Sequence, residues 1–174
     1  HPSYSYEDFV QGYRPTQNGF ALRDGVFYRF CEQARKDSSH SYVFVIDEIN
    51  RGNLAKIFGE LLMLLEGDKR NPEWAVPLAY GGPNAAPFFI PENVYLLGLM
   101  NTADRSLAVV DYALRRRFAF VSLRPEYASP RFKEYLREKG VTDSLAQRII
   151  GGMSALNAEI AKDRANFGPG YCIG

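Results

Sequence analysis

Runs of apolar residues along the chain predict three strands. Residues 42–46 (Tyr-Val-Phe-Val-Ile) form a β-branched and aromatic run that is too short for a buried helix. Such a run is typical of a strand covered on both faces, as in parallel sheets. Similar runs predict a second strand at 94–99 and a third at 118–123.

Helical spacing of apolar residues predicts helices between these strands. From Leu54 to Leu65 apolar residues recur three and four positions apart, with Asn53 or Asn50 as the N-cap and Gly67 as the stop. A further helix is predicted at 107–116. Because strands alternate with helices, the fold class is α/β with a mostly parallel sheet.

Two predicted hairpin inserts, followed by a change to polar helices, complete the predicted organisation. Residues 19–26 predict a β-hairpin that turns at Asp24-Gly25, and residues 74–90 predict another that turns at 81–84. After Pro125 the pattern changes to polar helices near 130–139 and 144–162. We therefore expect an α/β part at 1–124 and a helical part at 125–174.

Composition narrows the class of protein. The chain has 174 residues, 46% of them hydrophobic, and a formal net charge of +1. These values exclude wholesale disorder and argue against a dedicated nucleic-acid module, which usually carries a basic excess. Cys31 and Cys172 have no metal-ligand or disulfide-scaffold spacing, and no apolar run reaches 18 residues. We expect a cytoplasmic protein without membrane segments, and its start at His1 suggests a fragment.

An acidic pair, Asp47-Glu48, ends the first predicted strand. Parallel sheets place ligands at the carboxyl ends of their strands, and buried strands rarely end in two acids without a reason. In nucleotide hydrolases one acid holds the magnesium hydration shell while the other orients the attacking water. The alternative is that the pair only solvates the strand end or caps the next helix.

Two further polar groups follow the same logic. Asn101 and Asp104 come after the second strand, where an amide could hold both water and a phosphate oxygen; a turn with an N-cap is the alternative. Residues 115–117 are three arginines before the third strand. Guanidinium groups bind phosphate in bidentate fashion, although a charge run is more often a solvated helix face.

The longer segments around these groups resemble the McrB family of AAA+ GTPases, the motor subunits of modified-cytosine-specific restriction systems. The similarity lies in FVIDEINRGNL at 44–54, MNTADRSLA at 100–108, VVDYAL at 109–114 and RRRF at 115–118. The segments SYEDF at 5–9 and GYRP at 12–15 also resemble this family. The resemblance extends over nearly the whole chain.

The resemblance implies a role for each matching residue. Asp47 would coordinate Mg²⁺ through water, Glu48 would activate the attacking water, and Asn101 would hold that water against the γ-phosphate of GTP. Arg116 and Arg117 would reach the nucleotide of a neighbouring subunit, which implies a ring, hexameric in this family. The remaining signature or tuning residues are Asn50, Arg51, Asp104, Arg105 and Asp111, the first two lying where a partner subunit could tune the acidic pair.

The resemblance implies a partial AAA+ core at 1–124, which is followed by the beginning of a helical lid at 125–174. Its partners would be further copies of itself, an McrC-like nuclease subunit and DNA. The sequence contains no GxxxxGK[ST] loop, which supplies most phosphate affinity in such enzymes. We therefore expect this chain alone neither to bind nor to hydrolyse GTP. An ATP-dependent MoxR-like remodeller and a P-loop-less interaction scaffold are the alternatives.

Overall fold

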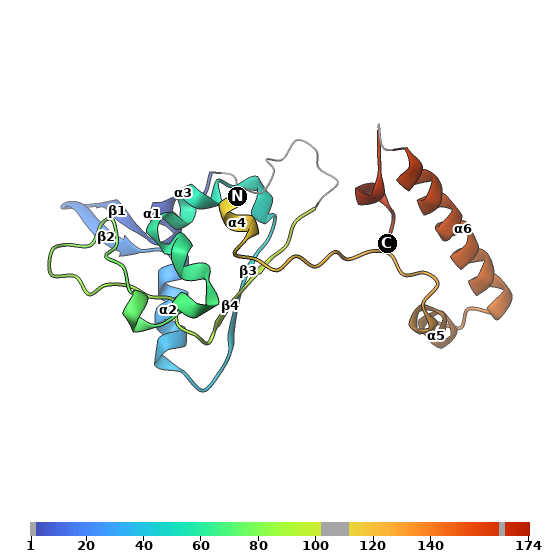
Figure 1. Ribbon diagram of the computed structural model, residues 1–174, viewed down its shortest axis with the longest axis horizontal. Helices are drawn as coiled ribbons and strands as arrows, with labels where there is room; N and C mark the ends of the chain where they lie inside the picture. Colours follow the sequence, from blue (N-terminus) through green and yellow to red (C-terminus); the bar gives the residue numbers. More distant parts are fainter. Residues whose placement is uncertain (1–2, 102–111, 164–165) are drawn as a thin grey trace. The chain divides into compact units, whose positions relative to one another are not determined.

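The computed structural model describes residues 3–101, 112–163 and 166–174, which fall into two units (Figure 1). The larger unit contains the described residues up to 100 and those from 112 to 119. The smaller one contains residue 101 and those from 120 onward. The predicted boundary after residue 124 stays a prediction.

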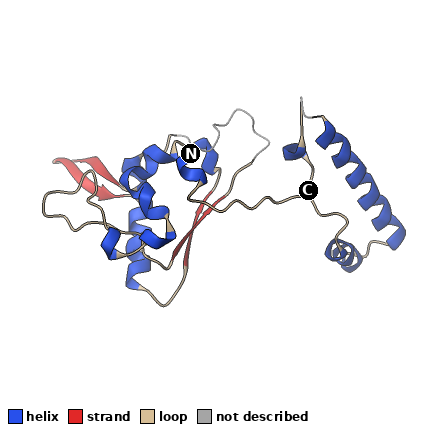
Figure 2. Ribbon diagram, viewed as in Figure 1, coloured by secondary structure: helices blue, strands red, loops and turns tan. Residues whose placement is uncertain are grey.

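The larger unit has a mixed α/β composition, in keeping with the predicted class (Figure 2). Its helices and strands are α1 (Tyr6–Phe9), β1 (Gln11–Thr16), β2 (Gly19–Asp24), α2 (Val26–Lys36), β3 (Tyr42–Ile46), α3 (Leu54–Phe58), β4 (Val94–Gly98) and α4 (Tyr112–Arg115). Short 3₁₀ helices occur at Ile49–Arg51, Gly59–Leu65, Gly67–Lys69 and Pro72–Trp74.

Strands β3 and β4 form a parallel pair, as the sequence predicts. Their register runs from Tyr42 opposite Val94 to Ile46 opposite Gly98. Only one face of the pair is covered by the described residues, however, so the predicted burial of both faces is wrong for this part of the chain. The other face exposes alternate side chains by about half: Val43 (55%), Val45 (52%), Tyr95 (53%) and Leu97 (49%).

The predicted third strand at 118–123 is wrong. No strand is formed there, and Val121 and Leu123 are 82% and 92% exposed. A strand needs a neighbour to take its backbone hydrogen bonds, and none of the described residues pairs with this segment. Of the predicted helix at 107–116, residues 112–115 form α4 and residue 116 lies in the turn after it, while 107–111 lie outside the described residues.

The first hairpin exists, but at another position. β1 pairs antiparallel with β2, from Gln11 opposite Asp24 to Thr16 opposite Gly19, so the turn lies at 17–18 and not at Asp24-Gly25. Gly25 instead begins α2 as its N-cap. In the second insert, Val76 and Phe88 form a single antiparallel bridge, and no strand is described at 74–90.

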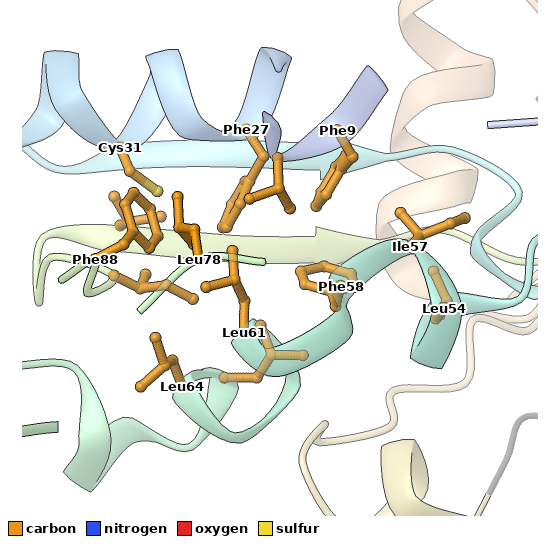
Figure 3. Packing of buried hydrophobic residues seen from close by; sticks show 14 of the residues in the cluster. Phe9, Phe27, Cys31, Leu54, Ile57, Phe58, Leu61, Leu64, Leu78 and Phe88 are labelled. Carbon is orange, nitrogen blue, oxygen red and sulfur yellow. The ribbon is translucent and has the colours of Figure 1, made fainter. Parts of the chain in front are cut away.

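A cluster of aromatic rings forms the core beneath the covered face of the sheet. The ring centroid of Phe9 lies 4.9 Å from that of Phe27 and 4.8 Å from that of Phe58 (Figure 3). Phe27, Cys31 and Ala34 recur at helical spacing along α2 and are fully buried. Helix α2 thus turns one apolar stripe toward the strands.

The predicted helix from Leu54 to Leu65 is divided in two. Asn53 caps α3, accepting a hydrogen bond from the Lys56 backbone N–H at 3.0 Å, as one of the two predicted caps. Gly59 then adopts a φ of +53°, which an α-helix does not allow, and the chain continues as a 3₁₀ helix. The apolar spacing survives this break, so Leu61, Leu64 and Leu65 still reach the core.

The smaller unit confirms both predicted polar helices, as α5 (Pro130–Glu138) and α6 (Asp143–Lys162). Ser129 and Thr142 cap them, and Arg137 bonds Asp143 at 2.8 Å across the turn between them. A 3₁₀ helix follows at Pro169–Tyr171. Among the described residues, no helix combines the length and the apolar character that crossing a bilayer requires.

Candidate functional site

The acidic pair lies at the carboxyl end of the parallel strands. β3 ends at Ile46, whose carbonyl accepts a hydrogen bond from the Leu99 N–H at 2.9 Å. The Ile49 N–H donates back to the Leu99 carbonyl, also at 2.9 Å. These two hydrogen bonds join Leu99, two residues before Asn101, to the residues just before and just after the acidic pair. The pair thus lies at the edge where parallel sheets bind ligands.

Glu48 has a left-handed backbone, with φ 50° and ψ 47°. This conformation is rare outside glycine and costs on the order of 1–2 kcal/mol. The Asp47 carboxylate compensates in part, because its Oδ1 accepts the Glu48 N–H at 3.0 Å. The resulting turn leaves both acidic side chains exposed beyond the end of the strand.

Arg51, three residues after Glu48, contacts the acidic pair. Arg51 Nε lies 2.8 Å from Glu48 Oε2, and both side chains are partly exposed. The amide oxygen of Asn50 is buried and accepts no hydrogen bond from the described residues. That a partner subunit tunes the acidic pair through Asn50 and Arg51 stays a prediction.

A cavity of about 320 Å³ opens beside this turn. Asp47, Glu48 and Arg51 contribute charged groups to its lining, and most of its other lining residues are apolar. These apolar residues include Phe9, Phe44, Ile57 and Phe58. The acidic turn thus borders a hollow in the protein rather than a flat surface.

Arg116 and Arg117 line a second, polar cavity of about 610 Å³. Arg117 is only 9% exposed and its Nη2 lies 3.0 Å from Glu66 Oε1, whereas Arg116 is exposed. Lys69 Nζ lies 2.5 Å from Glu66 Oε2. Its hydrogen bond, followed by the charges of Lys69 and both arginines, lowers the pKa of Glu66.

The two cavities have no lining residue in common. The structure therefore places Arg51 beside Glu48 but pairs Arg117 with Glu66, and Arg116 lines the same cavity as Glu66. Asn101 is exposed and follows β4 closely along the chain, while Asp104, Arg105 and Asp111 lie outside the described residues. The roles assigned to all of these residues stay predictions.

Sequence reasoning missed Glu66 and Lys69. They belong to the segment EGDKR at 66–70, whose mixed charges look like those of an ordinary solvated loop. A contact with a distant arginine leaves no periodic signal in the sequence. Only the fold reveals that this loop and the arginines form one cluster.

The donor groups at the acidic turn fit Mg²⁺. Carboxylate oxygens are its preferred protein ligands, and Mg²⁺ usually keeps several waters while taking one or two carboxylates together with substrate phosphates. Within the described ranges, no cluster of three or more His, Cys, Asp or Glu could form a closed metal cage. Asp47, with one oxygen engaged by the turn, suits such an open and hydrated arrangement.

Comparisons with known proteins match most or all of this chain. Residues 1–118 match the AAA domain of the dynein-related subfamily. The chain is 53% identical over its full length to the type IV methyl-directed restriction enzyme EcoKMcrB subunit of Escherichia coli K12. It is 28% identical over 151 residues, 79% of the chain, to the type II restriction enzyme BsuMI component YdiS of Bacillus subtilis 168.

The chain spans 38% and 43% of the lengths of these two relatives. The family model matches residues 1–118, and the identity to the first relative extends over the whole chain. Both matches include the acidic pair that follows the parallel strand β3. The chain therefore belongs to the McrB family of AAA+ proteins.

Proposed function

We propose that this chain is the Walker B, sensor-1 and arginine part of a GTP-hydrolysing motor in a restriction system that acts on 5-methylcytosine DNA. The observation that carries the proposal is the acidic pair at the carboxyl end of β3, fastened to the chain that leads to Asn101. Both relatives are named as components of restriction enzymes, which supports this biological setting.

In the proposed reaction, Glu48 takes a proton from the water that attacks the γ-phosphate, and Asn101 orients that water. Asp47 would help to hold Mg²⁺, which would supply neutralisation of the charge on the phosphates. Because Arg51 is paired with the Glu48 carboxylate, it sets the direction of that carboxylate before substrate arrives. Asn50 brings an unsatisfied amide oxygen close to the same turn, available to a water or a partner donor.

The arginines act in a neighbouring subunit's site in this proposal. Arg116 and Arg117 line a cavity that excludes their own acidic pair, which supports a function toward another copy's nucleotide. Such an arrangement requires a ring, which we propose to be a hexamer. Hydrolysis around it would drive DNA translocation and cleavage by a separate McrC-like nuclease subunit.

The test is hydrolysis by the intact motor that contains this chain together with a P-loop. Glu48→Gln keeps the shape of the side chain but removes the base, so we expect hydrolysis to fall by about 10²- to 10⁴-fold. Binding of a labelled GTP analogue should be preserved. The matched control is Glu73→Gln, an exposed glutamate outside both cavities, which should hydrolyse like the parent.

Normal turnover by Glu48→Gln would contradict the proposal, as would loss of hydrolysis in the control alone. Competition between GTP and ATP decides the nucleotide. Preference for ATP would reject the GTPase assignment and favour the remodeller. Absence of any nucleotide binding would favour the scaffold.

A further inference from the structure

Glu66 and Arg117 connect two distant parts of the larger unit. Glu66 lies between the 3₁₀ helices Gly59–Leu65 and Gly67–Lys69, while Arg117 follows α4. The ion pair between them measures 3.0 Å, and the side chains are 27% and 9% exposed. A charged side chain that is nine-tenths buried requires charged or strongly polar partners, and Glu66 is one that helps to hold Arg117 in place.

The neighbouring Arg116 has a different environment. It is exposed and borders the same polar cavity as Glu66 and Arg117. The Arg117 N–H donates to the Leu114 carbonyl at 2.9 Å, which keeps the chain after α4 in a tight turn. Anchoring the Arg117 side chain therefore fixes the backbone from which Arg116 extends.

We propose that Glu66 is the positioning residue of the arginine pair: it holds Arg117 and thereby presents Arg116 toward the nucleotide of the adjacent subunit. This inference rests on the proposed function. An arginine side chain has many rotamers, and holding its charge in place beforehand lowers the cost of reaching the transition state. Glu66 does not itself touch the nucleotide.

The surroundings of Glu66 suit this task. Lys69 engages one carboxylate oxygen at 2.5 Å while Arg117 engages the other at 3.0 Å. The carboxylate therefore has a fixed orientation. The lowered pKa of Glu66 keeps it ionised at neutral pH, so the anchor stays charged when the motor is active.

The first experiment measures steady-state hydrolysis by the intact motor carrying Glu66→Gln. Because misplacement of a charge-stabilising group affects the transition state more than the ground state, kcat should fall by up to about a hundredfold. KM should change by less than about twofold, since uniform binding is untouched. A raised KM at unchanged kcat would overturn the proposal.

Two variants provide matched controls. Asp68→Asn removes the same charge from the same cavity without breaking the anchor, and it should keep the parental kcat. Lys69→Gln removes the other partner of Glu66 but leaves Arg117 paired, so it should lose much less activity than Glu66→Gln. Equal losses in Asp68→Asn and Glu66→Gln would show a general charge effect and reject the positioning role.

Mixed rings separate positioning from folding. A Glu48→Gln subunit cannot hydrolyse but keeps its arginine pair, and a Glu66→Gln subunit keeps its own acidic pair. Mixing them should restore hydrolysis above that of either variant alone, because each intact acidic pair can then face an intact arginine pair. A merely misfolded Glu66→Gln subunit would not be rescued, and that result would overturn the proposal.

A third mixture tests the underlying function separately. Arg116→Gln mixed with Glu48→Gln should show the same rescue if the arginines act between subunits. Failure of this mixture would reject the ring arrangement itself. Its success with failure of the Glu66→Gln mixture would reject only the role of Glu66.

Discussion

At the scale of single residues, polar side chains hold the N-terminal end of β3. The acidic pair lies at the other end of this strand. The Asp37 carboxylate accepts hydrogen bonds from the Ser39 and Tyr42 hydroxyls at 2.8 and 2.9 Å, and it lies 2.9 Å from His40 Nδ1. The Asn93 amide donates to the backbone carbonyls of residues 34, 37 and 40. Polar contacts thus help to hold this end of the sheet, beside the packing of Tyr42 against Phe30.

These contacts make the stability of the N-terminal end of β3 depend on pH. Hydrogen bonds from His40, Ser39 and Tyr42 lower the pKa of Asp37 to about 2 from 3.8, and the bond to Asp37 raises the pKa of His40 above 6.5. The contribution of Asp37 to the stability of the fold is thus present above pH 3.8 and is lost as the pH falls toward 2. That of His40 is complete below pH 6.5 and is lost as the pH rises through its raised pKa.

Titration of the His40 ring by NMR checks this pair. We expect a pKa above 6.5 in the parent and a return toward 6.5 in Asp37→Asn, because the anionic partner is removed. Asp68→Asn removes an acid that lies in the cavity with Glu66 and Lys69, and it should leave the His40 titration unchanged. An identical His40 pKa in the parent and Asp37→Asn would contradict the pair.

At the scale of elements, close backbone approaches decide where helices and hairpins begin. Gly25 joins β2 to α2, and its N–H donates to the Val10 carbonyl at 2.7 Å. A Cβ added there would lie 2.3 Å from the backbone carbon and oxygen of Phe9. The Asp-Gly pair looks like a hairpin turn in the sequence, but the glycine is needed for this contact between segments.

Gly25→Ala should therefore destabilise the fold. We expect a loss of about 1–3 kcal/mol in the free energy of unfolding, because backbone atoms must shift to admit the methyl group. Chemical denaturation of the two proteins measures it. Gly82→Ala is the control, since a Cβ there meets nothing within 4 Å and the change should be within about 0.5 kcal/mol. Equal stability of Gly25→Ala and the parent would refute the packing argument.

At the scale of the whole molecule, the parallel pair has one covered face and one apolar exposed face. In register, Val43 lies opposite Tyr95 and Val45 opposite Leu97, so the four exposed side chains form a continuous patch. An exposed apolar patch of this kind promotes association.

The isolated chain should consequently self-associate, and Leu97→Lys should reduce that association by placing a charge in the patch. Sedimentation or light scattering across a concentration series measures the effect. Leu123→Lys is the matched control: Leu123 is 92% exposed but lies outside the sheet, so its replacement should matter less. A parent chain that stays monomeric, or equal effects of the two substitutions, would contradict this expectation.

The local pattern of the sequence determined the positions of β3 and β4 and of the polar helices α5 and α6, and it narrowed the cap of α3 to Asn53 or Asn50, because periodicity and capping act over a few neighbouring residues. Its motifs also identified the family and predicted the acidic pair. Only the tertiary structure decided the hairpin register, the division of the helix at Gly59 and the absence of a strand at 118–123. The same holds for the partnership of Glu66 with Arg117. Each of these depends on which distant segment is available as a neighbour, and no local pattern of residues encodes that.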